Sequence, residues 1–171
     1  MTVSSDRVQE LLDRQDIVDC VHRYARGIDR GDVALVASCY HPDAIDHHGS
    51  YVGPGHGLAE WVLAAQAGSV VRTQNHITTH IAEINGDVAH AETYYLVVLR
   101  KTSGEINIAT GRYIDRFERR DGEWRIADRL CLVESLAETT AVDVERLDTA
   151  YVGARDRTDP SYQRPLTLPN S

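Results

Sequence analysis

The sequence predicts an α+β fold in which N-terminal helices cover the concave face of a curved antiparallel sheet. The helical patterns of apolar residues all lie before about residue 67, and long strand patterns follow one another from residue 72 to residue 133. Helices followed by a meander of strands are typical of α+β domains. The strands are separated by sequences that favour tight antiparallel connections: Asn85-Gly86-Asp87, Thr102-Ser103-Gly104 and Arg120-Asp121-Gly122.

The clearest single element is an amphipathic helix that ends near residue 30. Asp29 lies at the border of its apolar arc, close to the end where the helix dipole disfavours an anion. From the helix alone, a carboxylate that faces water or an arginine explains this position well. Gly31 ends the helix, Asp32 is suited to cap a short second helix, and a third helix is expected over residues 57–67. The apolar arc of the first helix consists of Ile17, Val18, Cys20, Val21, Tyr24, Ala25 and Ile28.

Four long strands complete the predicted fold, after shorter extended pieces around residues 45 and 51–52. Apolar residues occur at both strand parities in residues 94–99, which indicates a strongly curved sheet with room for a pocket beneath the helices. The length fits a single domain, which we place at residues 1–136. We expect residues 137–171 to be a C-terminal extension that packs on this domain or on a neighbouring subunit. The long strands are expected over residues 72–84, 88–101, 106–119 and 124–133.

Composition argues against several classes of partner. The formal net charge of -8 and the dispersed arginines argue against nucleic-acid binding, which needs clustered positive charge. The sequence has no apolar run near the roughly 20 residues of a membrane helix, and its first residues lack the pattern of a signal peptide. We therefore expect a cytoplasmic protein without membrane contact. The cysteines, Cys20, Cys39 and Cys131, have apolar neighbours and are expected to be free thiols of the core.

Several motifs together resemble the SnoaL-like branch of the nuclear transport factor 2 superfamily, a cone-shaped fold that encloses an apolar pocket. The resemblance covers nearly the whole chain. The superfamily includes dehydratases, isomerases, epoxide hydrolases, dioxygenase small subunits and binding modules without chemistry, so it implies the fold more specifically than the function. The motifs are the helix end from Tyr24 to Asp32, Gly49-Ser-Tyr-Val-Gly53, the strand with His76, Thr110-Gly-Arg-Tyr-Ile-Asp115 and Glu118-Arg-Arg-Asp-Gly-Glu-Trp124-Arg-Ile.

The resemblance implies a catalytic set of Asp29, His76, Tyr24 and Arg129. His76 would act as the base, and Asp29, bonded to the other ring nitrogen, would orient it and stabilise the imidazolium. Tyr24 would donate a hydrogen bond to a substrate oxygen, and Arg129 would supply positive charge beside it. Elimination of water by such a set needs neither a metal nor a redox cofactor, and we expect none.

Less specialised roles remain open for two of these residues. A backbone hydrogen bond within its strand also explains His76. An ion pair with an acid of the sheet, such as Glu92 or Asp115, also explains Arg129.

Other side chains are candidates for the pocket wall. His80 has the same strand parity as the proposed base, so both are expected on one face of the sheet. Tyr94, Tyr95 and Tyr113 can line the pocket, although tyrosines on long strands also serve as packing residues. Trp61 lies on the third helix, where it can close the cone. We select His80, Tyr94, Tyr113 and Trp61 as substrate-binding residues.

A group of histidines around residues 41–48 raises the question of a metal site. His47 and His48 are adjacent in an extended segment, with His41 and Asp46 nearby. Adjacent residues of a strand point to opposite faces, and no second compact ligand motif accompanies them, so a metal site is not expected.

The function predicted from these observations is that of a cofactor-independent lyase, which removes water from a cyclic and largely apolar molecule such as a steroid, polyketide or terpenoid ketone. The alternatives are an isomerase or epoxide hydrolase in the same pocket, and a ligand-binding or assembly module without turnover. Apolar residues at both strand parities also predict that a second subunit covers part of the convex face, giving a homodimer or homotrimer.

Overall fold

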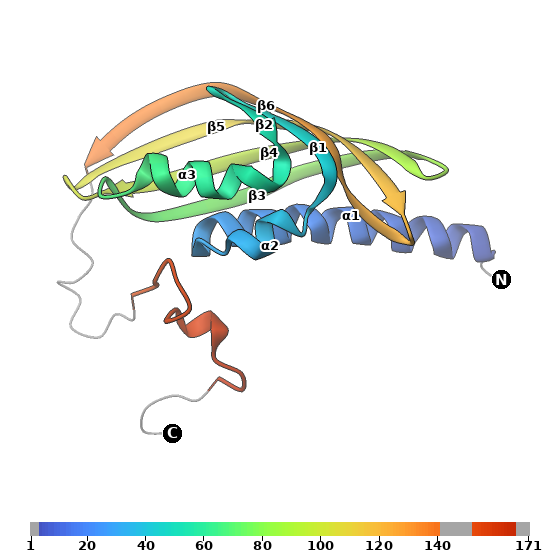
Figure 1. Ribbon diagram of the computed structural model, residues 1–171, viewed down its shortest axis with the longest axis horizontal. Coiled ribbons are helices and arrows are strands. Elements are labelled where there is room, and N and C mark those ends of the chain that lie inside the picture. The colour runs from blue at the N-terminus through green and yellow to red at the C-terminus, as the bar shows by residue number, and fades with distance from the viewer. Residues whose placement is uncertain (1–3, 141–151, 167–171) are drawn as a thin grey trace.

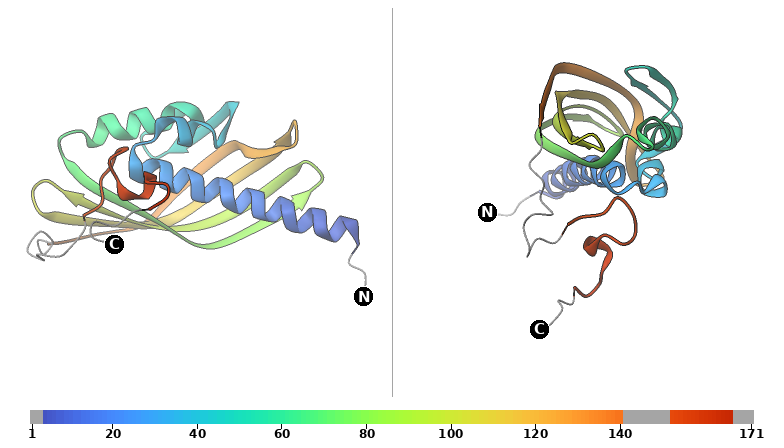
Figure 2. Two further views of the ribbon diagram at one scale, coloured as in Figure 1. Left: turned by 90° about the horizontal axis from the view of Figure 1, so that it is seen from below. Right: turned by 90° about the vertical axis from the view of Figure 1, so that its left-hand side faces the viewer.

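The computed structural model describes residues 4–140 and 152–166 and confirms the predicted α+β class. One curved six-stranded sheet has the strand order β2-β1-β6-β5-β4-β3, and the helices lie along its concave side (Figures 1 and 2). The elements are α1 (Ser5–Arg30), α2 (Val33–Ala37), β1 (Tyr40–His48), β2 (Tyr51–Pro54), a 3-10 turn (Gly55–Gly57), α3 (Leu58–Gln66), β3 (Val70–Asn85), β4 (Val88–Lys101), β5 (Glu105–Arg120), β6 (Glu123–Thr140) and a second 3-10 turn (Pro160–Tyr162).

Helix α1 packs its apolar arc against the sheet, as the sequence predicts. Ser4 caps its N-terminus by accepting a hydrogen bond from the backbone of Arg7, and Gly31 ends it in the left-handed conformation at φ 62°. Tyr24, on the buried face, lies edge-on to Tyr113 of β5, with 5.6 Å between the ring centroids. No helix of the described part of the chain is long and apolar enough to cross a membrane.

Strands β3 to β6 form an antiparallel meander, and β1 joins it in parallel with β6. Strand β6 continues to Thr140, seven residues beyond the predicted end at 133, and still pairs there with Glu105 of β5. The side chains of residues 133–140 are all exposed. The sequence there lacks the alternation of apolar and polar residues that predicts a strand, so the hydrogen-bonded end of β6 is not recognised from the sequence. The expected extension 137–171 therefore begins within β6.

Residues 152–166 of this extension lie on the helical side of the domain (Figure 1). Asp159 forms an ion pair of 3.3 Å with Arg30 at the end of α1. Tyr162 donates a hydrogen bond of 3.1 Å to the carboxylate of Asp32, the residue that caps α2. Residues 152–166 thus lie against the α1–α2 junction, whereas residues 141–151 and 167–171 lie outside the described part.

Candidate functional site

A cavity of about 330 Å³ lies between α3 and the concave face of the sheet. Its walls are mainly apolar, with Trp61 and Val62 on the helix and Val97 and Leu99 on β4. Volumes of this order hold small organic ligands, whose orientation is fixed by a few polar groups. The polar side chains that reach this cavity include Tyr24, His48, Thr73, Asn75, Tyr113 and Cys131.

A buried ion pair lies behind the tyrosine side of the cavity wall. The Nε and Nη2 atoms of Arg129 each donate a hydrogen bond of 2.7 Å to the carboxylate of Asp115, and both side chains are fully buried. The guanidinium packs against the rings of both Tyr24 and Tyr113, 4.2 and 4.1 Å from their centroids. Although burial opposes the charged form, attraction to Asp115 raises the pKa of Arg129 above its usual value.

This geometry resolves the two roles considered for Arg129. The guanidinium forms the ion pair with Asp115, which the sequence offered as an alternative, and it does not line the cavity. Tyr24 and Tyr113, whose rings it contacts, do line the cavity, so Arg129 supports the cavity wall from behind.

A second polar group on the cavity wall comes from β1. The Nδ1 atom of His48 lies 3.5 Å from Oδ1 of Asp46, whose other oxygen accepts a hydrogen bond of 2.6 Å from the hydroxyl of Tyr40. Asp46 is fully buried, whereas 23% of the His48 side chain is exposed. Asp46 and His48 are two positions apart on one strand, so both point inward, and the intervening His47 is exposed.

The charges of this pair stabilise each other. Burial alone would lower the pKa of His48, but its proximity to Asp46 and Cys131 raises it to about 9. Burial alone would raise the pKa of Asp46, but the contact with His48 and the charge of Arg129 lower it. At neutral pH, His48 is therefore an imidazolium that reaches the cavity, beside a buried carboxylate.

The predicted hydrogen bond between Asp29 and His76 is not formed. The Asp29 carboxylate accepts hydrogen bonds from Thr73 Oγ1 at 3.1 Å, from the Asn75 backbone at 3.0 Å and from Asn75 Nδ2 at 2.6 Å. Asn75 faces the cavity, so the next residue of the strand, His76, points to the other face and is exposed. Asp29 thereby ties the end of α1 to β3.

The expectation that His76 and His80 share a face is also wrong. Ile77 pairs with Tyr95 and His80 with Thr93, so β3 carries one extra residue between these pairs, and this bulge turns His80 inward. The Nδ1 atom of His80 lies 2.8 Å from the hydroxyl of the fully buried Thr93. Burial lowers the pKa of His80.

Of the other residues predicted to bind the substrate, two line the cavity and one does not. Trp61 and Tyr113 line the cavity as expected, and the ring of Trp61 lies 5.4 Å from that of Tyr51. Tyr94 is 40% exposed and lies under Arg112 on the convex face. Its neighbour Tyr95 points into the cavity instead, where its ring stacks on Tyr113 at 4.6 Å.

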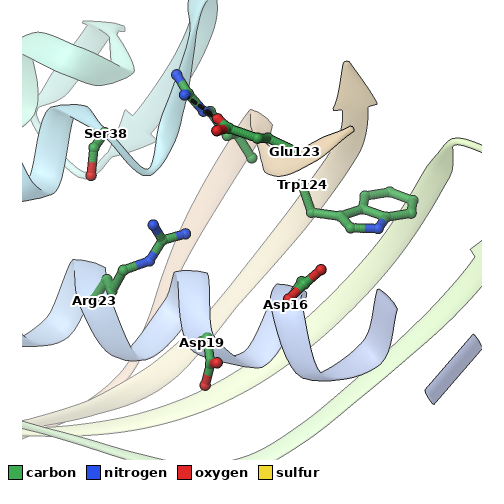
Figure 3. Close-up of a pocket in the computed structure, with 7 residues that line it drawn as sticks. Asp16, Asp19, Arg23, Ser38, Glu123 and Trp124 are labelled. Atoms are coloured by element: carbon green, nitrogen blue, oxygen red, sulfur yellow. Dashed lines mark hydrogen bonds and ion pairs between the residues drawn. The ribbon is translucent and has the colours of Figure 1, made fainter. Parts of the chain in front are cut away.

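A second hollow lies between α1 and the start of β6 (Figure 3). It has a volume of about 450 Å³ and is bordered by exposed charges of both signs, among them Asp16, Asp19 and Arg23 of α1. Glu123 and Arg125, on its other side, pair with each other. We place the candidate site in the cavity under α3, because its walls are mainly apolar and the titratable side chains of Tyr24, His48 and Tyr113 reach it.

The histidines of residues 41–48 are separated by the fold. His41 lies 2.9 Å from the backbone carbonyl of Glu118, and His47 and His48 face opposite sides of β1. Within residues 4–140 and 152–166, no group of three or more His, Cys, Asp or Glu side chains is placed to hold a metal ion. Sequence reasoning weighed Asp46 and His48 only as metal ligands, although their shared parity already placed both on one face.

Comparisons with known proteins agree with this architecture. A family model described as a SnoaL-like domain matches residues 9–130. Among solved structures, an Asp-to-Asn variant of a protein of unknown function from Mycobacterium tuberculosis is 29% identical, with a TM-score of 0.66 over 74% of each chain. No curated protein matches the sequence.

Two other solved structures have named activities. A hexachlorocyclohexane dehydrochlorinase from Novosphingobium barchaimii is 18% identical, with a TM-score of 0.71 over 80% of this chain and 96% of that one. A protein named as a candidate scytalone dehydratase, from Novosphingobium aromaticivorans, is 17% identical, with a TM-score of 0.66 over 86% of this chain and 93% of that one. At such identities these similarities concern the fold.

Proposed function

Because this chain belongs to the SnoaL-like family, we propose that it is a lyase-type enzyme, a dehydratase that acts on a cyclic and largely apolar molecule bound beneath α3. The observation that carries the proposal is His48, an imidazolium paired with a buried carboxylate on the wall of an apolar cavity. A dehydrochlorinase and a candidate dehydratase of the same fold support a β-elimination.

In the proposed reaction, His48 serves as both acid and base. In one coupled step, the electrons of the α-carbon–hydrogen bond form the double bond as the bond from the β-carbon to the hydroxyl breaks. The hydroxyl takes the proton of the imidazolium and leaves as water, and the imidazole takes the α-proton, so His48 ends the cycle as it began it. Asp46 holds the ring and stabilises its charged form. Tyr24 and Tyr113, on the same wall, face the carbonyl oxygen where negative charge develops.

The substrate class follows from the walls of the cavity. Trp61, Val62, Val97 and Leu99 offer apolar contacts, and a few polar side chains, among them His48 and Tyr113, interrupt this apolar lining. A fused-ring ketone of steroid, polyketide or terpenoid type fits such a lining, because it has an apolar body and few oxygen atoms.

A direct test offers β-hydroxy ketones of these classes to the purified protein without added nucleotide or metal. The wild type is expected to release water and to generate the absorbance of a conjugated ketone. His48→Gln should lower kcat by about 100-fold or more, as expected for the loss of a positioned acid and base. His47→Gln is the matched control, because His47 lies next in sequence but is exposed.

Other outcomes would reassign the function. A shift of a double bond without loss of water would make the protein an isomerase, and opening of an epoxide would make it an epoxide hydrolase. Tight binding of these molecules without any turnover would make it a binding module. Equal turnover by His48→Gln and the wild type would refute the proposed role of His48.

We also propose that the protein is a homodimer or homotrimer. The convex side of the sheet exposes large apolar side chains, among them Ile114 at 37% and Leu130 at 46%. A second copy of the chain can cover them. Light scattering at micromolar concentration should give a multiple of the 19.1 kDa chain mass, and a monomer would contradict the proposal.

A further inference from the structure

The three cysteines have different surroundings. Cys20 and Cys39 are fully buried in the core, where the thiol of Cys20 lies 3.4 Å from the backbone carbonyl of Cys39. Cys131, on β6, lines the cavity under α3 and is 9% exposed. Only Cys131 is thus placed to meet a molecule bound in that cavity.

Cys131 lies beside the charged pair of β1. Strands β1 and β6 are parallel, and His48 pairs with Cys131 in their register. Paired residues of neighbouring strands point to the same face, and the strands lie about 5 Å apart. Both of these residues line the cavity. A thiol, an imidazole and a carboxylate therefore follow one another in the order Cys131, His48 and Asp46. Catalytic thiols use this order, in which a third group orients the base.

Two further contacts fix the positions of these groups. The hydroxyl of Tyr95 lies 3.5 Å from the sulfur of Cys131 and donates a hydrogen bond of 2.9 Å to the carbonyl of Leu132. Tyr40 holds Asp46 from behind with its 2.6 Å hydrogen bond. The pKa of His48 is consistent with this arrangement, because its proximity to Asp46 and Cys131 raises it against the effect of burial.

From this geometry we propose that Cys131 is a nucleophile, which adds covalently to α,β-unsaturated ketones bound in the cavity. The choice of ligand class rests on the proposed function, since a conjugated ketone is the product of the elimination. The sulfur bonds to the β-carbon while the π electrons of the carbon–carbon double bond move towards the carbonyl. His48 gives its proton to the α-carbon and takes up the proton of the thiol. The net change adds S–H across the double bond, and no other reagent is consumed.

The experiment treats the full-length protein with 2-cyclohexenone and follows the mass of the intact chain and of its peptides. We expect one adduct per chain, located at Cys131, while Cys20 and Cys39 stay unmodified. Cys131→Ser should form none. In His48→Gln the rate of adduct formation should fall by about 100-fold, as for the loss of a positioned acid and base. His47→Gln should react at the wild-type rate.

A comparison with the unfolded chain keeps the test independent of how well the variants fold. In urea all three thiols are accessible, so the folded wild type should react faster at Cys131, and more slowly at Cys20 and Cys39, than the unfolded chain. Slower reaction of Cys131 in the folded protein, or an unchanged rate in folded His48→Gln, would overturn the proposal. Because cyclohexenone is supplied directly, its addition is measured whether or not the protein dehydrates β-hydroxy ketones.

Discussion

Replacing Asp115 by asparagine removes the negative partner of the buried Arg129 guanidinium beside the cavity. Arg129 donates two hydrogen bonds of 2.7 Å to Asp115, and neither residue is more than 2% exposed. The asparagine keeps the shape of the side chain but leaves the guanidinium without its counter-ion, and its amide group faces another donor. Breaking a buried pair in this way costs about 3–5 kcal/mol of unfolding free energy, because the remaining charge is desolvated.

Urea unfolding at neutral pH, followed by circular dichroism at a fixed protein concentration, measures this loss as a lower midpoint at an unchanged slope. For a chain of this size the melting temperature should fall by roughly 6–20 °C. Asp128→Asn is the matched control, because Asp128 pairs with Arg116 on the same two strands but on the exposed face, where such pairs contribute less than about 1 kcal/mol. If Asp115→Asn costs no more than this control, the tyrosine rings alone hold the charge and our account of Arg129 is wrong.

Three more outcomes can be measured on the same protein. The folded pKa of His48, about 9, lies above the usual 6.5 of histidine, so its stabilisation is complete below pH 6.5 and is lost as the pH rises through 9. Over this pH range the unfolding free energy of the wild type should fall by on the order of 3 kcal/mol relative to that of His48→Gln. Parallel curves of unfolding free energy against pH for the two proteins would contradict this. Ala109→Trp should fill the cavity and abolish retention of apolar ketones by equilibrium dialysis, whereas Ile81→Trp, at a 61% exposed position, should not. Asp29→Asn should lower the unfolding free energy by about 1–3 kcal/mol, because it weakens the hydrogen bonds from Thr73 and Asn75 of β3. The control Asp16→Asn, at an exposed position, should change it little. Equal effects of the two substitutions would show that Asp29 does not hold α1 against β3.

The sequence predicts the elements well because each has a local cause. The apolar arc of α1, the cap at Asp32 and the glycine of each turn act over a few residues, so their effects can be recognised without the tertiary structure. The end of β6 escapes prediction because residues 133–140 are held by pairing with β5 and their side chains remain exposed. Likewise, the sequence offers acids of the sheet such as Glu92 and Asp115 as partners of Arg129. Only the register of β5 with β6 shows that Asp115 lies opposite Arg129.

The site depends on strand parity, which a family resemblance does not determine. On β3 the inward position opposite Asp29 belongs to Asn75, so a shift by one residue places His76 on the convex face. The cavity nevertheless contains a histidine, because β1 runs beside β6 and turns His48 inward next to Cys131. An acid–base group thus enters the cavity from a different strand than the resemblance implies. For this reason His48, rather than His76, is the residue whose substitution tests whether the cavity is an active site.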